Sequence, residues 1–408
     1  MGRYLHFAML ESAVRHDNSK LEGEAAPTSS PVYLDCCATT PPLPEVVAEV
    51  MRFLAEEYGN EGSRTHGYGV AARKRVNQAR EEVAALVSAN SDEILFTSGA
   101  TEANNLAILG LASALREAGR THLVTSALEH KAVLEPMARL EEEGFAVTYV
   151  GAGESGVVDP EELLAAIGAE TGLVSLMHVN NETGVVQQLR RVAEALPDHV
   201  YLHVDGAQGV GKENEEISHP RIDLISVSAH KLHGPKGVGA LVARRRSYRR
   251  PPLQPLMVGG GQERGLRPGT VPVHLVAGFG TAAVLARAER EEREQVNRAF
   301  RERALAALAP LDPELNGDAD RALPHVLNVS FPGVDAEAAI LATKDLVALS
   351  SGSACNSGSF ERSHVLQAMG LEGDRLDGAL RFSWCHLTSA PNWEELVQRL
   401  QGLSSVTA

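Results

Sequence analysis

The chain has 408 residues, of which 44% are hydrophobic, and its formal net charge is −15. This length and apolar content allow a large core and two domains, whereas the acidic balance argues against a general nucleic-acid binder. No run of eighteen apolar residues occurs, so we expect no transmembrane helix, and we expect no direct nucleic-acid or membrane binding.

The first thirty residues do not have the pattern of a signal peptide. Their short apolar stretch is broken by Glu11 and Arg15, and no small-residue cleavage site follows it. We expect residues 1–30 to be a disordered leader or an expression remnant and leave them out of the fold prediction.

The four cysteines argue against a disulfide framework. Cys36 and Cys37 are adjacent, whereas Cys355 and Cys385 stand alone, and no CxxC pair occurs. We therefore expect no bound metal and a reducing, cytoplasmic setting.

Seven short apolar runs alternate with longer amphipathic segments after the leader. Helical patterns such as 104–119 and 159–170 lie between the runs. This alternation predicts an α/β fold with a doubly wound, mainly parallel, seven-stranded sheet. The predicted strands are 93–97, 122–127, 146–150, 173–179, 200–205, 223–228 and 237–243.

The C-terminal third has a different pattern. A charged helix is predicted over 281–308, followed by strands at 326–331 and 379–385. We predict a large domain over residues 31–280, whose first residues can pack on the small domain. The smaller α+β C-terminal domain covers residues 281–408 and includes the linking helix.

The carboxyl ends of the predicted strands are rich in polar groups. Ligands of open α/β sheets bind outside these ends, so they are the place to look for a site. The polar ends are Thr97–Glu102, Glu129–His130, His178–Glu182, Asp205–Gln208 and Ser228–Lys231.

Lys231 is the most informative of these residues. It lies in "SVSAHKLHGPKGVGAL", between a serine-histidine pair and a glycine-rich turn. A lysine amine forms Schiff bases with carbonyl groups, notably with pyridoxal phosphate. Asp205 at a strand end could partner the pyridinium nitrogen, and "TSGATEANNL" (97–106) could bind a phosphate at a helix N-terminus. Each signal alone also fits a helix cap or an ordinary turn.

Two residues of the C-terminal third are further candidates. Cys355 lies in "SSGSACNSGS", whose small residues favour an exposed, reactive thiol over a buried one. Arg381 interrupts the apolar segment "LRFSW". A buried arginine there would bind a substrate carboxylate or an internal carboxylate, and both alternatives stay open.

Taken together, the motifs resemble those of the cysteine desulfurases, which are pyridoxal-phosphate enzymes of fold type I with a class V aminotransferase-like chain. The resemblance covers about residues 31 to 400. It rests on "YLDCCATTP", "FTSGATEANNLAI", "EHKAVL", "MHVNNETGVVQ", "HVDGAQGVGK", "SAHKLHGPKGVGAL", "GGGQERGLRPGT", "NVSF" and "SSGSAC" in the order of the family.

The resemblance implies roles for individual residues. Lys231 resembles the lysine that binds the cofactor, and Cys355 the nucleophile that takes sulfur from L-cysteine as a persulfide, leaving L-alanine. His130 resembles the histidine stacked on the ring, which also serves in acid-base chemistry. Arg381 and Asn181 resemble the residues that hold the substrate carboxylate. The further cofactor contacts that it implies are Ala100, Thr101, Asp205, Gln208, Ser228, His230 and Thr270.

The resemblance also implies a homodimer, because Thr270 resembles a residue that reaches the cofactor phosphate of the neighbouring subunit. The sulfur then passes to an acceptor protein for iron-sulfur clusters, tRNA thiolation or DNA phosphorothioation. The paired cysteines of "LDCCATTPP" and the arginine-rich composition resemble the phosphorothioation branch.

The sequence departs from the family pattern at several positions. Pro268 stands where a small residue such as Ser is usual, and Cys385-His386 where Gly-Arg is frequent. Cys36 and Cys37 also stand where other residues are commoner, and we interpret them as small apolar fillers rather than as a redox pair.

Two alternative functions stay open. A selenocysteine lyase or cysteine sulfinate desulfinase would not need Cys355. A non-catalytic sulfur-relay scaffold with a vestigial site is the other, and the presence of Lys231, Asp205, His130 and Cys355 argues against it.

Overall fold

The computed structural model describes residues 30–351 and 362–404. The residues from Val32 onward belong to one compact unit, to which the following description refers. None of the helices in the two described ranges is long and apolar enough to span a bilayer.

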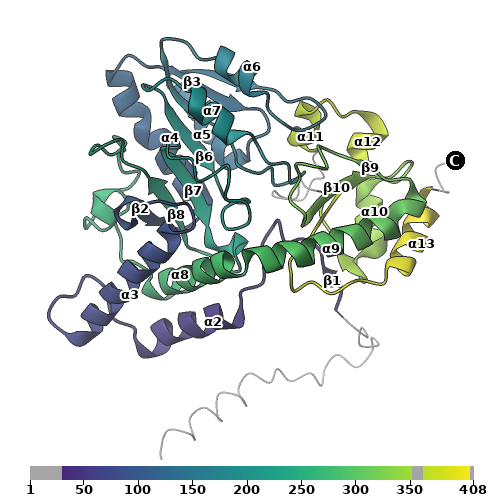
Figure 1. Cartoon of the computed structure of the whole chain (residues 1–408), viewed down its shortest axis with the longest axis horizontal. Coiled ribbons are helices and arrows are strands. Elements are labelled where there is room, and N and C mark those ends of the chain that lie inside the picture. The colour runs from purple at the N-terminus through teal and green to yellow at the C-terminus, as the bar shows by residue number, and fades with distance from the viewer. Residues whose placement is uncertain (1–29, 352–361, 405–408) are drawn as a thin grey trace, which may run out of the picture. The chain divides into compact units, whose positions relative to one another are not determined.

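A seven-stranded sheet organises the larger part of this unit (Figure 1). Its strand order is β2-β8-β7-β6-β5-β3-β4, in which β8 is antiparallel to both neighbours and the other pairs are parallel. The predicted α/β class and mainly parallel sheet are therefore confirmed. The strands are β2 (Ile94–Thr97), β3 (His122–Ser126), β4 (Ala146–Val150), β5 (Thr171–Ser175), β6 (Tyr201–Asp205), β7 (Leu224–Ser228) and β8 (Gly239–Ala243).

Both faces of this sheet are covered by helices. Successive residues of one strand enter different cores: Leu95 packs with residues of α4 and α5, whereas Phe96 packs with residues of α3 and α8. This follows from the two-residue period of a strand, and it explains why the strands are continuous apolar runs. The helices of this part are α2 (Pro44–Met51), α3 (Gly67–Ala84), α4 (Ala100–Glu117), α5 (Lys131–Glu142), α6 (Pro160–Ala165), α7 (Leu189–Ala195) and α8 (Val273–Ala288).

The prediction of one helix over residues 281–308 is wrong. Two helices, α8 and α9 (Arg290–Leu308), meet at Glu289, whose φ and ψ are −105° and 9°. The two helices pack against different cores: Phe279 of α8 joins the core of the large sheet, whereas Phe300 of α9 joins that of the C-terminal strands. The change in direction at Glu289 lets each helix pack against its own core.

A three-stranded antiparallel sheet of order β12-β10-β9 lies in the C-terminal part. Its core includes Leu327, Phe331, Phe382 and Trp384. The division into domains at residue 280 stays a prediction. The elements here are β9 (Glu314–Leu315), β10 (Val326–Ser330), α10 (Ala336–Thr343), β11 (Val347–Ala348), α11 (His364–Ala368), α12 (Gly373–Asp377), β12 (Ala379–Ser383) and α13 (Trp393–Ser404).

Residues 32–43 connect the C-terminal sheet to the loop that carries Lys231. Strand β1 (Val32–Tyr33) pairs in parallel with β11, and the backbone of Cys36 donates to the carbonyl of Ser383. A few residues later the backbone N–H and the hydroxyl of Thr40 both donate to the carbonyl of His230. The segment therefore fixes the position of the Lys231 loop relative to β12.

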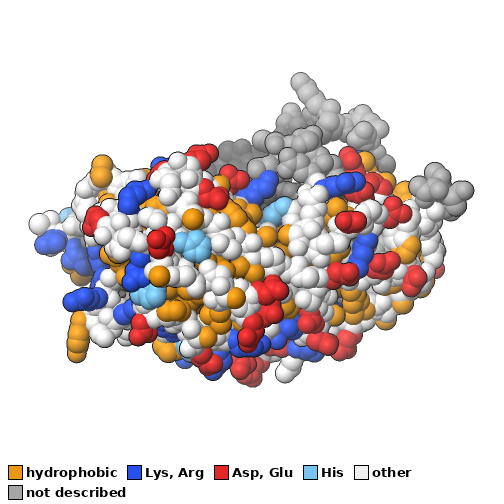
Figure 2. Space-filling view, turned by 90° about the horizontal axis from the view of Figure 1, so that it is seen from above, with side chains coloured by type: hydrophobic (Ala, Val, Ile, Leu, Met, Phe, Trp, Pro, Cys, Tyr) orange, Lys and Arg blue, Asp and Glu red, His pale blue; other side chains and the backbone are white. Residues whose placement is uncertain are grey.

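The surface carries mixed charges. On the face shown in Figure 2, lysine and arginine side chains are interspersed with aspartate and glutamate side chains.

Candidate active site

A cavity of about 550 Å³ lies at the carboxyl ends of the central strands. Ten of the residues predicted from the sequence line it, although they come from segments up to 281 positions apart. They are Ala100, Thr101, His130, Asn181, Asp205, Gln208, Ser228, His230, Lys231 and Arg381.

Lys231 follows β7 directly, in the short 3₁₀ turn Ala229–Lys231. Its Nζ donates to the carbonyl of Cys37 and, at 2.9 Å, to the carbonyl of Ala38. Both acceptors belong to the segment 32–43, which therefore directs the amine along one wall of the cavity. These two backbone carbonyls position the side-chain nitrogen of Lys231 at the cavity without a covalent bond to it.

Asp205 ends β6 and is 6% exposed. Its Oδ2 accepts a hydrogen bond of 2.7 Å from Nδ2 of Asn104 on α4, and its Oδ1 accepts one from the backbone of Ala207. Neither donor is a cation, so these two hydrogen bonds orient the carboxylate without forming a salt bridge. A buried carboxylate in this state is available to a cationic group of a ligand.

Three buried polar atoms on the cavity wall have no hydrogen-bond partner among the described residues: Oδ1 of Asn104, Oε1 of Gln208 and Nε of Arg381. The other end of the Gln208 amide donates to the carbonyl of Cys37 at 2.9 Å. Buried polar atoms are rarely left unpaired in native proteins. The wall is therefore built to contact a polar ligand.

The N-terminus of α4 forms one end of the cavity. Ala100 and Thr101 begin the helix, and its first N–H groups together with the helix dipole favour an anion. A side chain at Gly239 would bring its Cβ within 2.6 Å of the Cα of Gly99. Glycine at 239 thus lets β8 approach this helix terminus. Ser228, which pairs with Gly239 across β7 and β8, lies at the same corner.

His230 extends the same corner and is neutral. Its Nδ1 lies 3.1 Å from Oγ1 of Thr39. Burial, assisted by Lys231 and Lys236, lowers the pKa of His230 to about 4. At neutral pH the ring therefore contributes a hydrogen bond and no charge.

His130 caps the N-terminus of α5. Its Nδ1 accepts a hydrogen bond of 3.0 Å from the backbone of Ala132, so in the neutral ring Nε2 carries the proton. Burial lowers the pKa of His130. The ring is thus a neutral imidazole with a fixed tautomer on the cavity wall.

Arg381 lies at the opposite side, in the middle of β12, and is 5% exposed. Its Nη1 donates to the carbonyl of Asn181 at 2.9 Å, and its Nη2 contacts Oδ1 of Asp35 at 2.6 Å. The internal salt bridge considered from the sequence is therefore present. Because the arginine also lines the cavity with an unpartnered Nε, it can bind a carboxylate as well.

Thr270 and Cys355 are the two remaining predicted site residues. Thr270 is exposed and does not line the cavity. Cys355 lies outside the described residues. Sequence reasoning assigned no role to Asn104, Cys37 or Ala38, although all three lie within quoted motifs, because those motifs do not show which distant group each residue contacts.

The residues present fit pyridoxal phosphate. The amine of Lys231 suits the aldehyde, and the unpaired carboxylate of Asp205 suits a pyridinium nitrogen. The N-terminus of α4 suits the phosphate, and the unpartnered Oε1 of Gln208 provides a further polar contact on the wall. Fold and site thus define an α/β enzyme of the type that uses this cofactor.

Comparison with known proteins gives the family. The family model described as aminotransferase class-V matches residues 32–396, and the chain belongs to this family. Cysteine desulfurase IscS of Vibrio cholerae is 45% identical over 363 residues, which is 88% of this chain and 89% of that protein. The chain is therefore placed among the cysteine desulfurases, as its motifs predicted.

Two solved structures agree with this placement. The structure of DndA from Streptomyces lividans is 45% identical, has a TM-score of 0.76, and covers 90% of this chain and 99% of its own. A structure described as SspA in complex with cysteine is 34% identical with a TM-score of 0.76, covering 88% of this chain and all of its own.

Proposed function

We propose that this chain binds pyridoxal phosphate at Lys231 and converts L-cysteine to L-alanine, transferring the sulfur to Cys355 as a persulfide. The observation that carries the proposal is the convergence of ten predicted residues on one cavity. The structure bound to cysteine among the relatives supports this substrate. When bound, the cofactor stabilises negative charge that develops at the α-carbon of an amino acid.

Lys231 supplies the amine that holds the cofactor and, once displaced by substrate, the base that takes the α-proton. The carbonyls of Cys37 and Ala38 hold its Nζ at the wall in the meantime. Asp205 directs its carboxylate toward the pyridinium nitrogen of the cofactor, and Asn104 keeps the carboxylate in that orientation.

Arg381 binds the substrate carboxylate, assisted by the side chain of Asn181. Asp35 holds Nη2 on the other side, so the guanidinium cannot rotate freely in the cavity. His130, neutral and with its proton on Nε2, donates that proton within the cavity and is positioned to pass it between substrate and thiol.

The decisive experiment compares wild type with Cys355→Ser. Wild type should release L-alanine and, under reductant, sulfide from L-cysteine. The variant should keep the yellow colour of the bound cofactor but lose at least a hundredfold in rate, since a hydroxyl does not replace a thiolate as nucleophile. The retained colour shows that the variant is folded.

A selenocysteine lyase or a cysteine sulfinate desulfinase is the alternative. Those reactions do not require the thiol of Cys355, so a fully active Cys355→Ser variant would assign one of them. Rates on L-cysteine, L-selenocysteine and L-cysteine sulfinate, measured side by side, then identify the substrate.

The proposed active form is a homodimer in which Thr270 contacts the cofactor phosphate of the partner. Thr270 is exposed and does not line the cavity of its own chain, which supports a contact with the partner's cofactor. Mixing Lys231→Ala with Thr270→Ala tests it. If Thr270 of one chain completes the site of the other, the mixed dimer has one intact site and regains part of the activity. If each site is built within one chain, the mixed dimer has no intact site and regains none.

The proposed sulfur acceptor is a protein of iron-sulfur cluster assembly, tRNA thiolation or DNA phosphorothioation. The 45% identity to IscS and the 45% identity to DndA support the first and the last equally. Transfer of ³⁵S from L-cysteine to purified candidate acceptors distinguishes them.

A further inference from the structure

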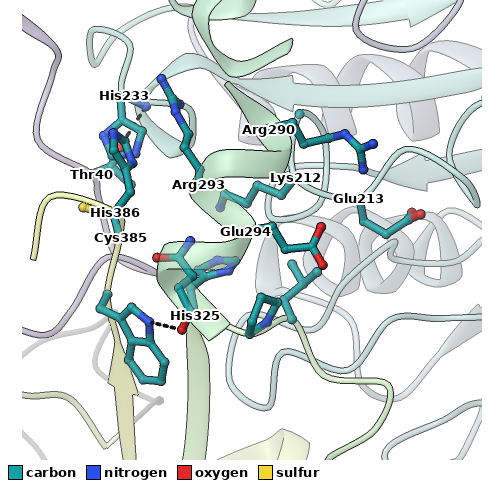
Figure 3. Close-up of a pocket in the computed structure, with 15 residues that line it drawn as sticks. Thr40, Lys212, Glu213, His233, Arg290, Arg293, Glu294, His325, Cys385 and His386 are labelled. Carbon is teal, nitrogen blue, oxygen red and sulfur yellow. Dashed lines mark hydrogen bonds between the residues drawn. The ribbon is translucent and has the colours of Figure 1, made fainter. Parts of the chain in front are cut away.

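A second cavity, of about 260 Å³, lies beside the segment 32–43 and away from the proposed active site. Its lining includes His233, Cys385 and His386 together with His325 and Trp384. Figure 3 shows His233, Cys385 and His386 gathered together near Thr40. None of these side chains has a role in the proposed reaction.

Three ligand-type atoms converge here. One nitrogen of His233, one nitrogen of His386 and Sγ of Cys385 all lie within 4.8 Å of one another. The two imidazole rings meet edge to face, with centroids 4.9 Å apart and an interplanar angle of 73°. A tetrahedral zinc ion separates its N and S ligands by about 3.3–3.8 Å. Side-chain shifts of about 1 Å would therefore complete the geometry.

His233 has one ring nitrogen available to a ligand. Its Nδ1 lies 2.9 Å from the carbonyl of Pro41, to which it donates, so Nε2 has a lone pair. Metal-binding histidines typically donate their second ring N–H to a carbonyl in this way. The backbone of His233 is left-handed, with φ of 63°, and its N–H donates to Thr40. The ring is thus held in place before any ligand arrives.

A second observation also points to a ligand in this cavity. His325 is 5% exposed, lines the same cavity, and its Nε2 finds no partner among the described residues. An unpaired buried ring nitrogen is costly unless water or a ligand contacts it.

The charges around the cavity are mixed. Lys212, Arg290 and Arg293 line it together with Glu213 and Glu294. The one additional cation opposes a bare metal ion, and it favours water or a small anion as the remaining ligand.

From this geometry we propose that His233, Cys385 and His386 bind a divalent transition-metal ion of the zinc class, with an exchangeable fourth ligand toward the cavity. One thiolate and two imidazoles suit zinc, whereas magnesium and calcium require oxygen ligands. The proposal does not depend on the proposed function. This metal site differs from the sequence-based expectation of no bound metal, because that expectation rested only on the spacing of the cysteines.

The ion would join two parts of the proposed active site. His233 follows Lys231 by two residues, and Cys385 follows Arg381 by four. Metal binding would therefore tie the Lys231 loop to the end of β12 and stabilise their relative position.

The test uses full-length, tag-free, cofactor-loaded protein carrying Cys355→Ser, which removes the catalytic thiol as a competing ligand. After chelator treatment and dialysis, this parent should take up one Zn²⁺ per chain, and Co²⁺ should give the intense visible bands of a tetrahedral thiolate site. Cys385→Ser and His386→Gln should each weaken Zn²⁺ binding at least tenfold and remove the cobalt bands. His274→Gln, which changes a half-buried histidine elsewhere, should bind as the parent does.

Thermal unfolding provides an independent readout. Zn²⁺ should raise the Tm of the parent and of His274→Gln by several degrees and should leave that of His386→Gln unchanged. His386 is only half-buried, so this variant decides the matter even if Cys385→Ser does not fold. Absence of stoichiometric Zn²⁺ binding in the parent overturns the proposal, and so does binding in both ligand variants that is as tight as in the parent.

Discussion

Nη2 of Arg381 lies 2.6 Å from Oδ1 of Asp35, although the two residues are 346 positions apart. The side chain of Arg381 is 6% exposed and that of Asp35 is 22% exposed. Asp35 belongs to the segment that also holds Nζ of Lys231 through Cys37 and Ala38. One short stretch of chain therefore positions both the proposed carboxylate-binding group and the proposed catalytic amine.

This arrangement predicts that Asp35 acts on substrate affinity through Arg381. Asp35→Asn should raise KM for L-cysteine about tenfold with a smaller effect on kcat, because a charge-assisted hydrogen bond contributes roughly 1.5–3 kcal/mol. Arg381→Lys should raise KM more, since an ammonium cannot form the planar contact. Steady-state kinetics on L-cysteine measure both.

The exposed pair Arg362–Asp377, at 2.8 Å, provides matched controls. Arg362→Lys and Asp377→Asn should leave KM unchanged, because exposed ion pairs contribute little. If Asp35→Asn behaved like Asp377→Asn, the positioning role of Asp35 would be wrong.

Lys231→Ala should be purified without the yellow colour and without measurable activity. The variant lacks the amine that forms the Schiff base, while other groups of the wall still contact the cofactor weakly. Absorption spectra after incubation with excess pyridoxal phosphate and gel filtration measure this. The exposed Lys344→Ala variant should be coloured as wild type is, and a coloured Lys231→Ala protein would contradict the assignment.

Asn104→Ala should weaken cofactor binding about tenfold, although the sequence assigned no role to Asn104. Its Nδ2 is 2.7 Å from Oδ2 of Asp205, and loss of a hydrogen bond to a charged group costs about 1.5–3 kcal/mol. Titration of apo-protein with pyridoxal phosphate gives the dissociation constant.

The neighbouring Asn105 is the control for Asn104. Its Nδ2 donates to the backbone carbonyl of Thr101, and its side chain does not line the cavity. Asn105→Ala should bind the cofactor nearly as wild type does. Equal losses in the two variants would show that only the helix had been disturbed.

His203 should make stability fall at acid pH. Its ring is fully buried between the hydroxyls of Ser175 and Ser226, and burial lowers its pKa from 6.5 to about 4. The folded state therefore resists protonation that the unfolded chain accepts below pH 6.5. Its stabilising contribution is present above pH 6.5 and is lost as the pH falls toward 4, by about 2 kcal/mol at pH 5.

Urea unfolding at pH 7.5 and pH 5 tests this prediction. His203→Gln should be less stable at pH 7.5 but should lose about 2 kcal/mol less than wild type between the two pH values. His199→Gln, at an exposed position, should show the wild-type difference. An unchanged difference in His203→Gln would mean that His203 is not the titrating group.

The sequence by itself determined the sheet and most of the candidate site. Each strand is a local apolar run, and residues such as Asp205, Ser228 and Lys231 stand directly at strand ends. The carboxyl ends of parallel strands meet at one edge, so local position along the chain was enough to bring these side chains together. The break between α8 and α9 was not visible, because residues 281–308 contain neither proline nor glycine.

Only the tertiary structure decided which distant groups pair. Asn104 with Asp205, Asp35 with Arg381, and His233 with Cys385 and His386 are contacts across 101 to 346 positions. The hydrophobic periodicity of a sequence indicates whether a residue is buried. The partner of a buried polar group depends instead on how separate helices, strands and loops pack together. The carbonyls that hold Lys231 are backbone atoms, which every residue has, so no sequence pattern could identify them.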